Sequence, residues 1–148
     1  MPERDFYQVS LKVLLENEKQ ETLLLKAVDY GIFAGYYDLP GGRIDVDEFT
    51  TPFEDIIRRE LKEEIGNCDV SIDPHIVGYG RILSPASMTR LEKDKHILYL
   101  CFRGKVRGEI HISDEHQGVR WVDLRKEDIS RLFVSGILDC VRMSLEDK

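Results

Sequence analysis

The chain has 148 residues, of which 42% are hydrophobic and 33% charged, a balance typical of one globular domain with a sizeable core. Its net charge of −7 argues against double-stranded nucleic acid as a partner, because phosphate contacts need lysine and arginine. No apolar run is long enough to cross a bilayer, and the first residues do not form a secretory signal. We therefore expect a single domain over residues 1–148, cytoplasmic and without a membrane partner.

The three cysteines, Cys68, Cys101 and Cys140, are widely spaced and odd in number. This pattern argues against a disulfide framework and favours a reducing compartment. Cys101 lies in an apolar stretch that is typical of a buried strand, so we expect it in the core.

The N-terminal region predicts a β-hairpin followed by a long loop. Tyr7 to Leu15 and Thr22 to Val28 are β-prone, and residues 16–20 between them form a polar turn. Asp29 to Asp47 is rich in glycine and aromatic residues, which predicts a loop with a short strand near Tyr37 to Leu39.

A helix is predicted to follow, with Thr51 as its N-cap and Pro52 as its first residue. Gly66-Asn67 is a typical helix end. Apolar residues recur at every fourth position and predict a buried stripe made of Phe53, Ile57, Leu61 and Ile65.

The second half of the chain predicts four more strands and a second helix. The strand candidates are Val70 to Ile72, Ile76 to Ile82, Ile97 to Val106 and Val119 to Val122. Ser130 to Leu145 is the helix candidate, and its apolar face comprises Leu132, Phe133, Ile137, Val141 and Met143. Strands interleaved with helices favour an α/β (α+β) fold with a mixed sheet held between helices.

The most informative feature is a carboxylate cluster on the first predicted helix. Glu60, Glu63 and Glu64 are neighbours on the helix surface, since residues three and four apart face each other. Like charges so close destabilise an isolated helix, whereas a divalent cation that takes oxygen ligands turns them into a site. The preceding Gly41-Gly42 pair lets backbone carbonyls approach a ligand. The sequence thus indicates a metal-dependent enzyme.

The segment from Gly42 to Gly66 resembles the sequence box of the Nudix hydrolases. The matching residues are Gly42, Glu48, Arg59-Glu60-Leu61, Glu63-Glu64 and Gly66, with Leu39-Pro40 as the usual lead-in. The stretch between Glu48 and Arg59 is three residues longer than is usual, and Asn67 replaces an aliphatic residue. An insertion before the helix explains the extra length, but a gap-free alignment would put Thr51 in the place of Glu48. The role of Glu48 therefore stays open.

The resemblance implies a Nudix-type α/β/α sandwich with a divalent metal site, Mg²⁺ or Mn²⁺. It implies that Glu60, Glu63 and Glu64 hold the metal and that the Gly41 carbonyl is a further ligand. Arg59 is placed to pair with Glu63 one turn away and so to orient it.

In this family a further acidic ligand or base often comes from a distant loop. Glu115, six residues before Trp121, is the candidate in this chain. Glu60 and Glu115 both stay open as the general base. The predicted catalytic set is accordingly Glu60, Arg59, Glu63 and Glu115.

The implied reaction is Mg²⁺-dependent hydrolysis of a pyrophosphate bond in a nucleoside diphosphate linked to another group. The short chain, without the long N-terminal extension common in sugar-specific relatives, favours a nucleoside triphosphate over ADP-ribose or a nucleotide sugar. A non-catalytic nucleotide-binding module of this fold is an alternative, but its usual mark is the loss of box carboxylates. Isomerisation of an isoprenoid diphosphate would need a cysteine near the cleft, and Cys68 is poorly placed for that role. A homodimer is expected by analogy with the family.

Overall fold

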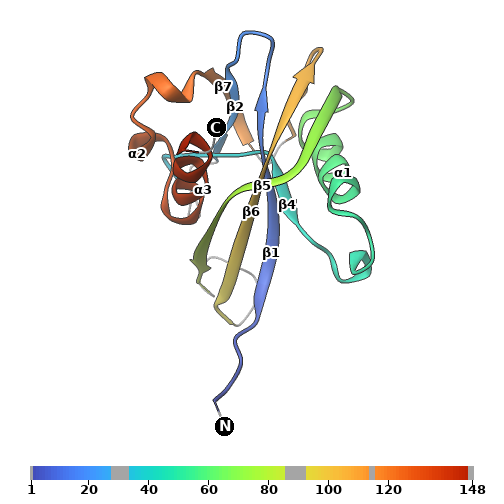
Figure 1. Ribbon diagram of the computed structural model, residues 1–148, viewed down its shortest axis with the longest axis vertical. Coiled ribbons are helices and arrows are strands. Elements are labelled where there is room, and N and C mark those ends of the chain that lie inside the picture. Colours follow the sequence, from blue (N-terminus) through green and yellow to red (C-terminus); the bar gives the residue numbers. More distant parts are fainter. Residues whose placement is uncertain (1, 28–33, 86–92, 114–115, 147–148) are drawn as a thin grey trace.

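The structure, a computed structural model, describes residues 2–27, 34–85, 93–113 and 116–146 (Figure 1). A mixed sheet runs through the middle of the molecule. Helix α1 (Phe53–Ile65) covers one side, and α2 (Ile129–Leu132) and α3 (Ser135–Glu146) cover the other. The α/β/α architecture predicted from the sequence is confirmed. No helix in these ranges is long and apolar enough to cross a membrane.

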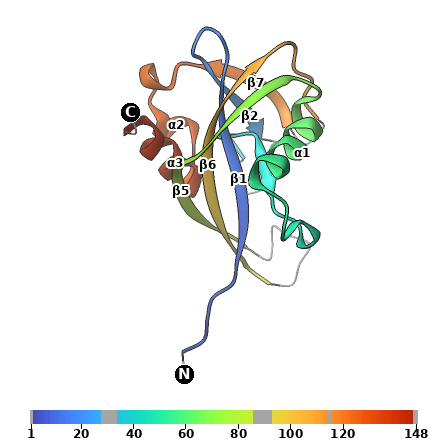
Figure 2. The ribbon, with the colours of Figure 1, turned by 45° about the vertical axis from the view of Figure 1, so that its right-hand side comes forward.

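The sheet has the strand order β3-β2-β1-β6-β5, with β4 paired to β1 and β7 paired to β2. Strands β1 and β6 run parallel, and every other pair is antiparallel (Figure 2). The bounds are β1 Tyr7–Glu16, β2 Thr22–Ala27, β3 Tyr37–Asp38, β4 Gly41–Arg43, β5 Asp69–Ser84, β6 Lys95–Arg107 and β7 His116–Val122. The predicted hairpin is present, with Glu16 opposite Thr22.

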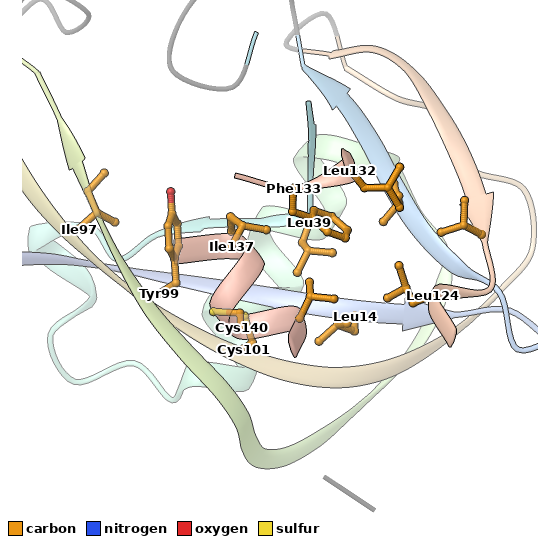
Figure 3. Close-up of a cluster of buried hydrophobic side chains, with 13 residues drawn as sticks. Leu14, Leu39, Ile97, Tyr99, Cys101, Leu124, Leu132, Phe133, Ile137 and Cys140 are labelled. Atoms are coloured by element: carbon orange, nitrogen blue, oxygen red, sulfur yellow. The ribbon is translucent and has the colours of Figure 1, made fainter. Parts of the chain in front are cut away.

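Strand β1 separates two buried clusters because its side chains alternate between the faces of the sheet. Leu11, Val13 and Leu15 face α1, whereas Leu14 packs on the α3 side. Figure 3 shows the second cluster, in which Phe133, Ile137 and Cys140 of the C-terminal segment meet Leu14, Tyr99 and Cys101 of the sheet. Cys101 is fully buried, as predicted.

The first helix differs from its prediction at the start. Helix α1 begins at Phe53, so Pro52 is the N-cap rather than the first helical residue. Phe53 is 42% exposed, and its predicted place in the buried stripe is wrong; Ile56 is buried instead. A strict four-residue repeat drifts around a helix of 3.6 residues per turn, so the stripe leaves the core at one end. Gly66 ends the helix with φ 84°, as expected.

The second half of the chain contains two further differences. The two strands predicted between residues 70 and 82 are one strand, β5, with irregular register between Ile72 and Gly78. The predicted second helix is broken: Phe133 is extended and Ser135 has φ 49°. The break turns Phe133 into the core, where it is 1% exposed. Burial of this large side chain outweighs the loss of a few helical hydrogen bonds.

Candidate active site

Gly41 and Glu64 form a buried contact in the candidate site. The backbone of Gly41 has φ +130°, and a Cβ here would overlap the carbonyl of Leu11. Only glycine fits, because other residues rarely adopt this conformation and none avoids the overlap. The Gly41 N–H donates to Glu64 Oε1 at 2.6 Å, and Glu64 is 5% exposed. Strand β4 and helix α1 are thereby joined at one carboxylate.

Gly42 allows a second close approach between the same two elements. A Cβ at Gly42 would overlap the carboxyl group of Glu60, which lies against the strand. The glycine pair was predicted to lie in a loop, but it forms β4 and pairs with β1. The structure thus brings Glu60 and Glu64 against the glycine pair.

The environment of the two buried carboxyl groups disfavours their charged forms. Burial raises the pKa of Glu64 to about 8, although Lys12 and the Gly41 N–H act in the opposite direction. Burial also raises the pKa of Glu60, and Arg59 opposes this shift. A nearby cation would stabilise both carboxylates, so these two groups have the electrostatic character of metal ligands.

Arg59 binds the outer end of the cluster. Its guanidinium donates to both oxygens of Glu48, at 2.7 and 2.6 Å, and to Glu60 Oε1 at 2.9 Å. The contact with Glu63, which the sequence suggested as its main pair, is 3.5 Å long. Arg59 therefore orients Glu60 more closely than Glu63, and Glu48 is its principal partner.

A turn just before the lengthened stretch positions Glu48 for its contact with Arg59. This turn is a 3₁₀ helix, η1 (Val46–Glu48), in which the Asp45 N–H donates to Glu48 Oε1 at 2.9 Å. The Arg59 guanidinium and this N–H lower the pKa of Glu48. The D-x-x-E spacing of a helix start was a signal for this turn that the sequence analysis did not use.

Lys12 is a site residue that the sequence analysis missed. It lies on β1, is 6% exposed, and points to the α3 side of the sheet. Its ammonium donates to Asp38 Oδ2 at 3.0 Å and to the Leu39 carbonyl at 3.3 Å, and lies 5.9 Å from the Tyr99 ring centre. Burial alone would lower the pKa of Lys12, but Asp38 and Glu64 raise it overall. The available signal was a single lysine within the apolar run Ser10 to Leu15, because lysine is rarely buried without a partner.

The oxygen donors of the site fit a hard divalent cation such as Mg²⁺ or Mn²⁺. Glu60 and Glu64 are brought together at the glycine pair, and Glu63 lies nearby with a side chain that is 60% exposed. Among the described residues, no three acidic, histidine or cysteine side chains converge as a ready-made metal site. The Glu64 carboxyl instead accepts a hydrogen bond from the Gly41 N–H, and the Glu60 carboxyl accepts one from Arg59. Glu115, the predicted distant ligand, lies outside the described residues.

A family profile described as the NUDIX domain matches residues 6–133. The chain belongs to the Nudix family. The enzyme class predicted from the sequence, a Nudix pyrophosphohydrolase, is confirmed with it.

Named relatives agree with this assignment. The chain is 31% identical over 124 residues to nucleoside triphosphatase NudI from Escherichia fergusonii, a match that covers 79% of this chain and 84% of that protein. The crystal structure of a MutT protein from Methanosarcina mazei Go1 matches with TM-score 0.71 and 29% identity over 96% of both chains. An ADP-ribose pyrophosphatase from Streptococcus suis matches with TM-score 0.62 over 95% of this chain and 91% of that one. Its 21% identity shows the shared fold alone.

Proposed function

We propose that this Nudix hydrolase cleaves a pyrophosphate bond in a nucleoside triphosphate with the help of Mg²⁺ or Mn²⁺. The observation that carries the proposal is the buried Glu64 carboxyl, held against Gly41 beside Glu60, with a pKa of about 8. A buried carboxyl group with a raised pKa is typical of a functional site, and a bound cation would stabilise its charged form. The similarity to a nucleoside triphosphatase at 31% identity supports the choice of substrate class.

Glu60, Glu63 and Glu64, with the Gly41 carbonyl, would hold the cation. When bound, the cation would offset the negative charge of the phosphate oxygens and lower the pKa of the water bound to it. Arg59, fixed in place by Glu48, holds the carboxylate of Glu60 in one orientation. This arrangement reduces the motion of the ligands before substrate arrives.

In the proposed reaction, water attacks phosphorus while the bond to the leaving pyrophosphate oxygen breaks. A nucleoside triphosphate then gives a nucleoside monophosphate and pyrophosphate. Glu60 is one candidate for accepting the proton of the water, since it is partly buried and its pKa is raised. Glu115 is the other candidate.

Two alternative functions would give different results when the same compounds are tested. An ADP-ribose or nucleotide-sugar pyrophosphatase would release a nucleoside monophosphate and a sugar phosphate. A non-catalytic module would bind nucleotides without turnover, but all three helix carboxylates of the box are present. The single domain over residues 1–148, the cytoplasmic location and the homodimer stay predictions.

The test is a panel of nucleoside triphosphates, ADP-ribose and nucleotide sugars, incubated with the purified chain with and without Mg²⁺. We expect Mg²⁺-dependent release of pyrophosphate from at least one triphosphate. The Glu64→Gln variant should lower kcat by about a hundredfold or more, as is usual when a metal ligand is lost. No Mg²⁺-dependent turnover on any compound would contradict the proposal.

Glu64→Gln is suited to this test because it removes the ionisable carboxyl group and changes little else. Glutamine has the same shape, and its carbonyl oxygen can accept the hydrogen bond from Gly41. Glu54→Gln is the matched control, since Glu54 lies in the first turn of the same helix and pairs only with the exposed Arg58 among the described ion pairs. The control should keep the activity of the unchanged chain.

A further inference from the structure

We infer that Lys12 is a positioning residue for the metal site, acting through the turn that leads to Gly41. This inference rests on the proposed function, because it concerns the same carboxylates. The Lys12 ammonium donates to Asp38 and to the Leu39 carbonyl, and its charge acts on Glu64. Its effect on the site passes through this backbone and through its charge.

Lys12 contacts the turn that leads to Gly41 through two hydrogen bonds. The ammonium binds Asp38 and the Leu39 carbonyl, two consecutive residues at the end of β3. The other Asp38 oxygen accepts from the Leu39 N–H at 2.7 Å. A buried cation thus fixes the chain two residues before Gly41.

Backbone hydrogen bonds connect this turn to Glu64. Lys12 lies opposite Gly41 in the pairing of β1 with β4, and the Val13 N–H donates to the Pro40 carbonyl at 2.9 Å. Gly41 in turn donates to Glu64. Each contact in this series joins residues that are buried or partly buried, so water competes little for any of them.

Burying the charged Lys12 ammonium carries a desolvation penalty. A hydrophobic residue of similar size usually replaces a buried ion pair without loss of stability. Packing alone therefore gives no reason for a lysine among Leu11, Val13 and Leu14. Its ammonium carries a positive charge that favours the ionised form of Glu64. A role in holding an acidic site explains both the charge and its place.

The test compares Lys12→Met with Leu14→Ala by Mn²⁺ binding, followed by electron paramagnetic resonance, and by thermal unfolding. Leu14 is on the same strand and face and is 2% exposed, so its truncation should cost about 2–5 kcal/mol of stability. We expect Lys12→Met to weaken Mn²⁺ binding about tenfold or more, and to lower Tm as well because Asp38 loses its cation. Leu14→Ala should lower Tm and leave Mn²⁺ affinity within about twofold.

A second variant keeps the test decisive if Lys12→Met does not fold because Asp38 is left unpaired. The double variant Lys12→Met/Asp38→Asn contains no unpaired buried charge at this place, and it should lose Mn²⁺ affinity by the same factor. In a Glu64→Gln background, Lys12→Met should weaken binding by less than about threefold, since its target is already gone.

The inference is overturned if a folded variant that lacks Lys12 binds Mn²⁺ within about twofold of the unchanged chain. Parallel losses of stability and affinity in Lys12→Met and Leu14→Ala would also overturn it, because they indicate a packing role. If the unchanged chain itself binds no Mn²⁺, the proposed metal site fails and the inference with it. The two failures are therefore distinguished by the unchanged chain.

Discussion

The two ends of the carboxylate cluster differ in how their charge is balanced. At the inner end, Glu64 is 5% exposed, accepts from Gly41 and has a pKa raised to about 8. At the outer end, Glu48 accepts from Nε and Nη2 of Arg59, and the pKa of Glu48 is lowered. One end has a carboxyl whose charge is disfavoured, and the other has a completed ion pair.

This difference separates two roles that the sequence box combines. A completed ion pair near the surface fixes geometry and adds little stability. A buried carboxyl with a raised pKa responds strongly to a new cation. We therefore assign metal binding to the inner end, at Glu64, and orientation of Glu60 to the outer end, at Glu48 and Arg59.

The largest effect is expected from Gly42→Ala at the inner end. The added Cβ would overlap the Glu60 carboxyl, so the side chain must leave the strand. We expect kcat to fall about a hundredfold, since misplaced ligands lose most of the transition-state stabilisation. Steady-state kinetics at saturating Mg²⁺ would measure the loss.

The control for this change is Gly118→Ala on β7. Gly118 has no heavy atom within 4 Å of an added Cβ, so the variant should keep the activity of the unchanged chain. Equal losses in the two variants would show that activity depends on the strand backbone in general rather than on the place of Glu60.

A smaller effect is expected from Glu48→Gln at the outer end. Arg59 loses its principal carboxylate but keeps its bond to Glu60 at 2.9 Å, so kcat should fall by less than about tenfold. Asp47→Asn, the exposed neighbour in the same turn, should have no effect. A loss as large as that of Glu64→Gln would mean that Glu48 is itself a metal ligand.

The smallest effect is a change of metal-free stability with pH. The pKa of Glu64 is 4.5 in its unperturbed form and about 8 in the folded chain. Between these values the folded chain holds a proton that the unfolded chain has released, so raising the pH favours unfolding. Thermal scans should show Tm falling by about 10 °C from pH 5 to pH 8.

The Glu64→Gln variant is the comparison for these scans, because it removes the titrating group. Its Tm should fall much less over the same range, since only the smaller contribution of Glu60 remains. A fall of equal size in the variant would assign the pH dependence to another group. The lowered pKa of Glu48 acts in more acidic solution and does not enter this window.

Much of the fold was predictable because its signals are local. The hairpin of β1 and β2 follows from alternating apolar residues around a polar turn. The first helix follows from its apolar repeat and from Gly66 at its end. The break at Phe133 was not predictable, since the residues before and after it continue an apolar helical pattern. The break is favoured only because it buries Phe133 in the core.

The candidate site divides in the same way. Glu60, Glu63 and Glu64 are close in sequence, so helix geometry alone places them at neighbouring positions of α1. The partners of Arg59 and of Gly41 depend on the path of the chain between residues 41 and 53, which spacing does not determine. Lys12 was missed because it reaches Asp38 and Leu39 from a strand 26 residues earlier. Contacts of this range are set by the packed fold.

The most direct test is calorimetry of Mg²⁺ or Mn²⁺ binding at pH 7 in buffers with different heats of ionisation. With a pKa of about 8, Glu64 is mostly protonated before the metal binds, and it must lose its proton to become a ligand. The account predicts release of about one proton from the unchanged chain, and close to none from the more weakly binding Glu64→Gln variant. Binding with equal proton release in both proteins, or with no release in either, would contradict it.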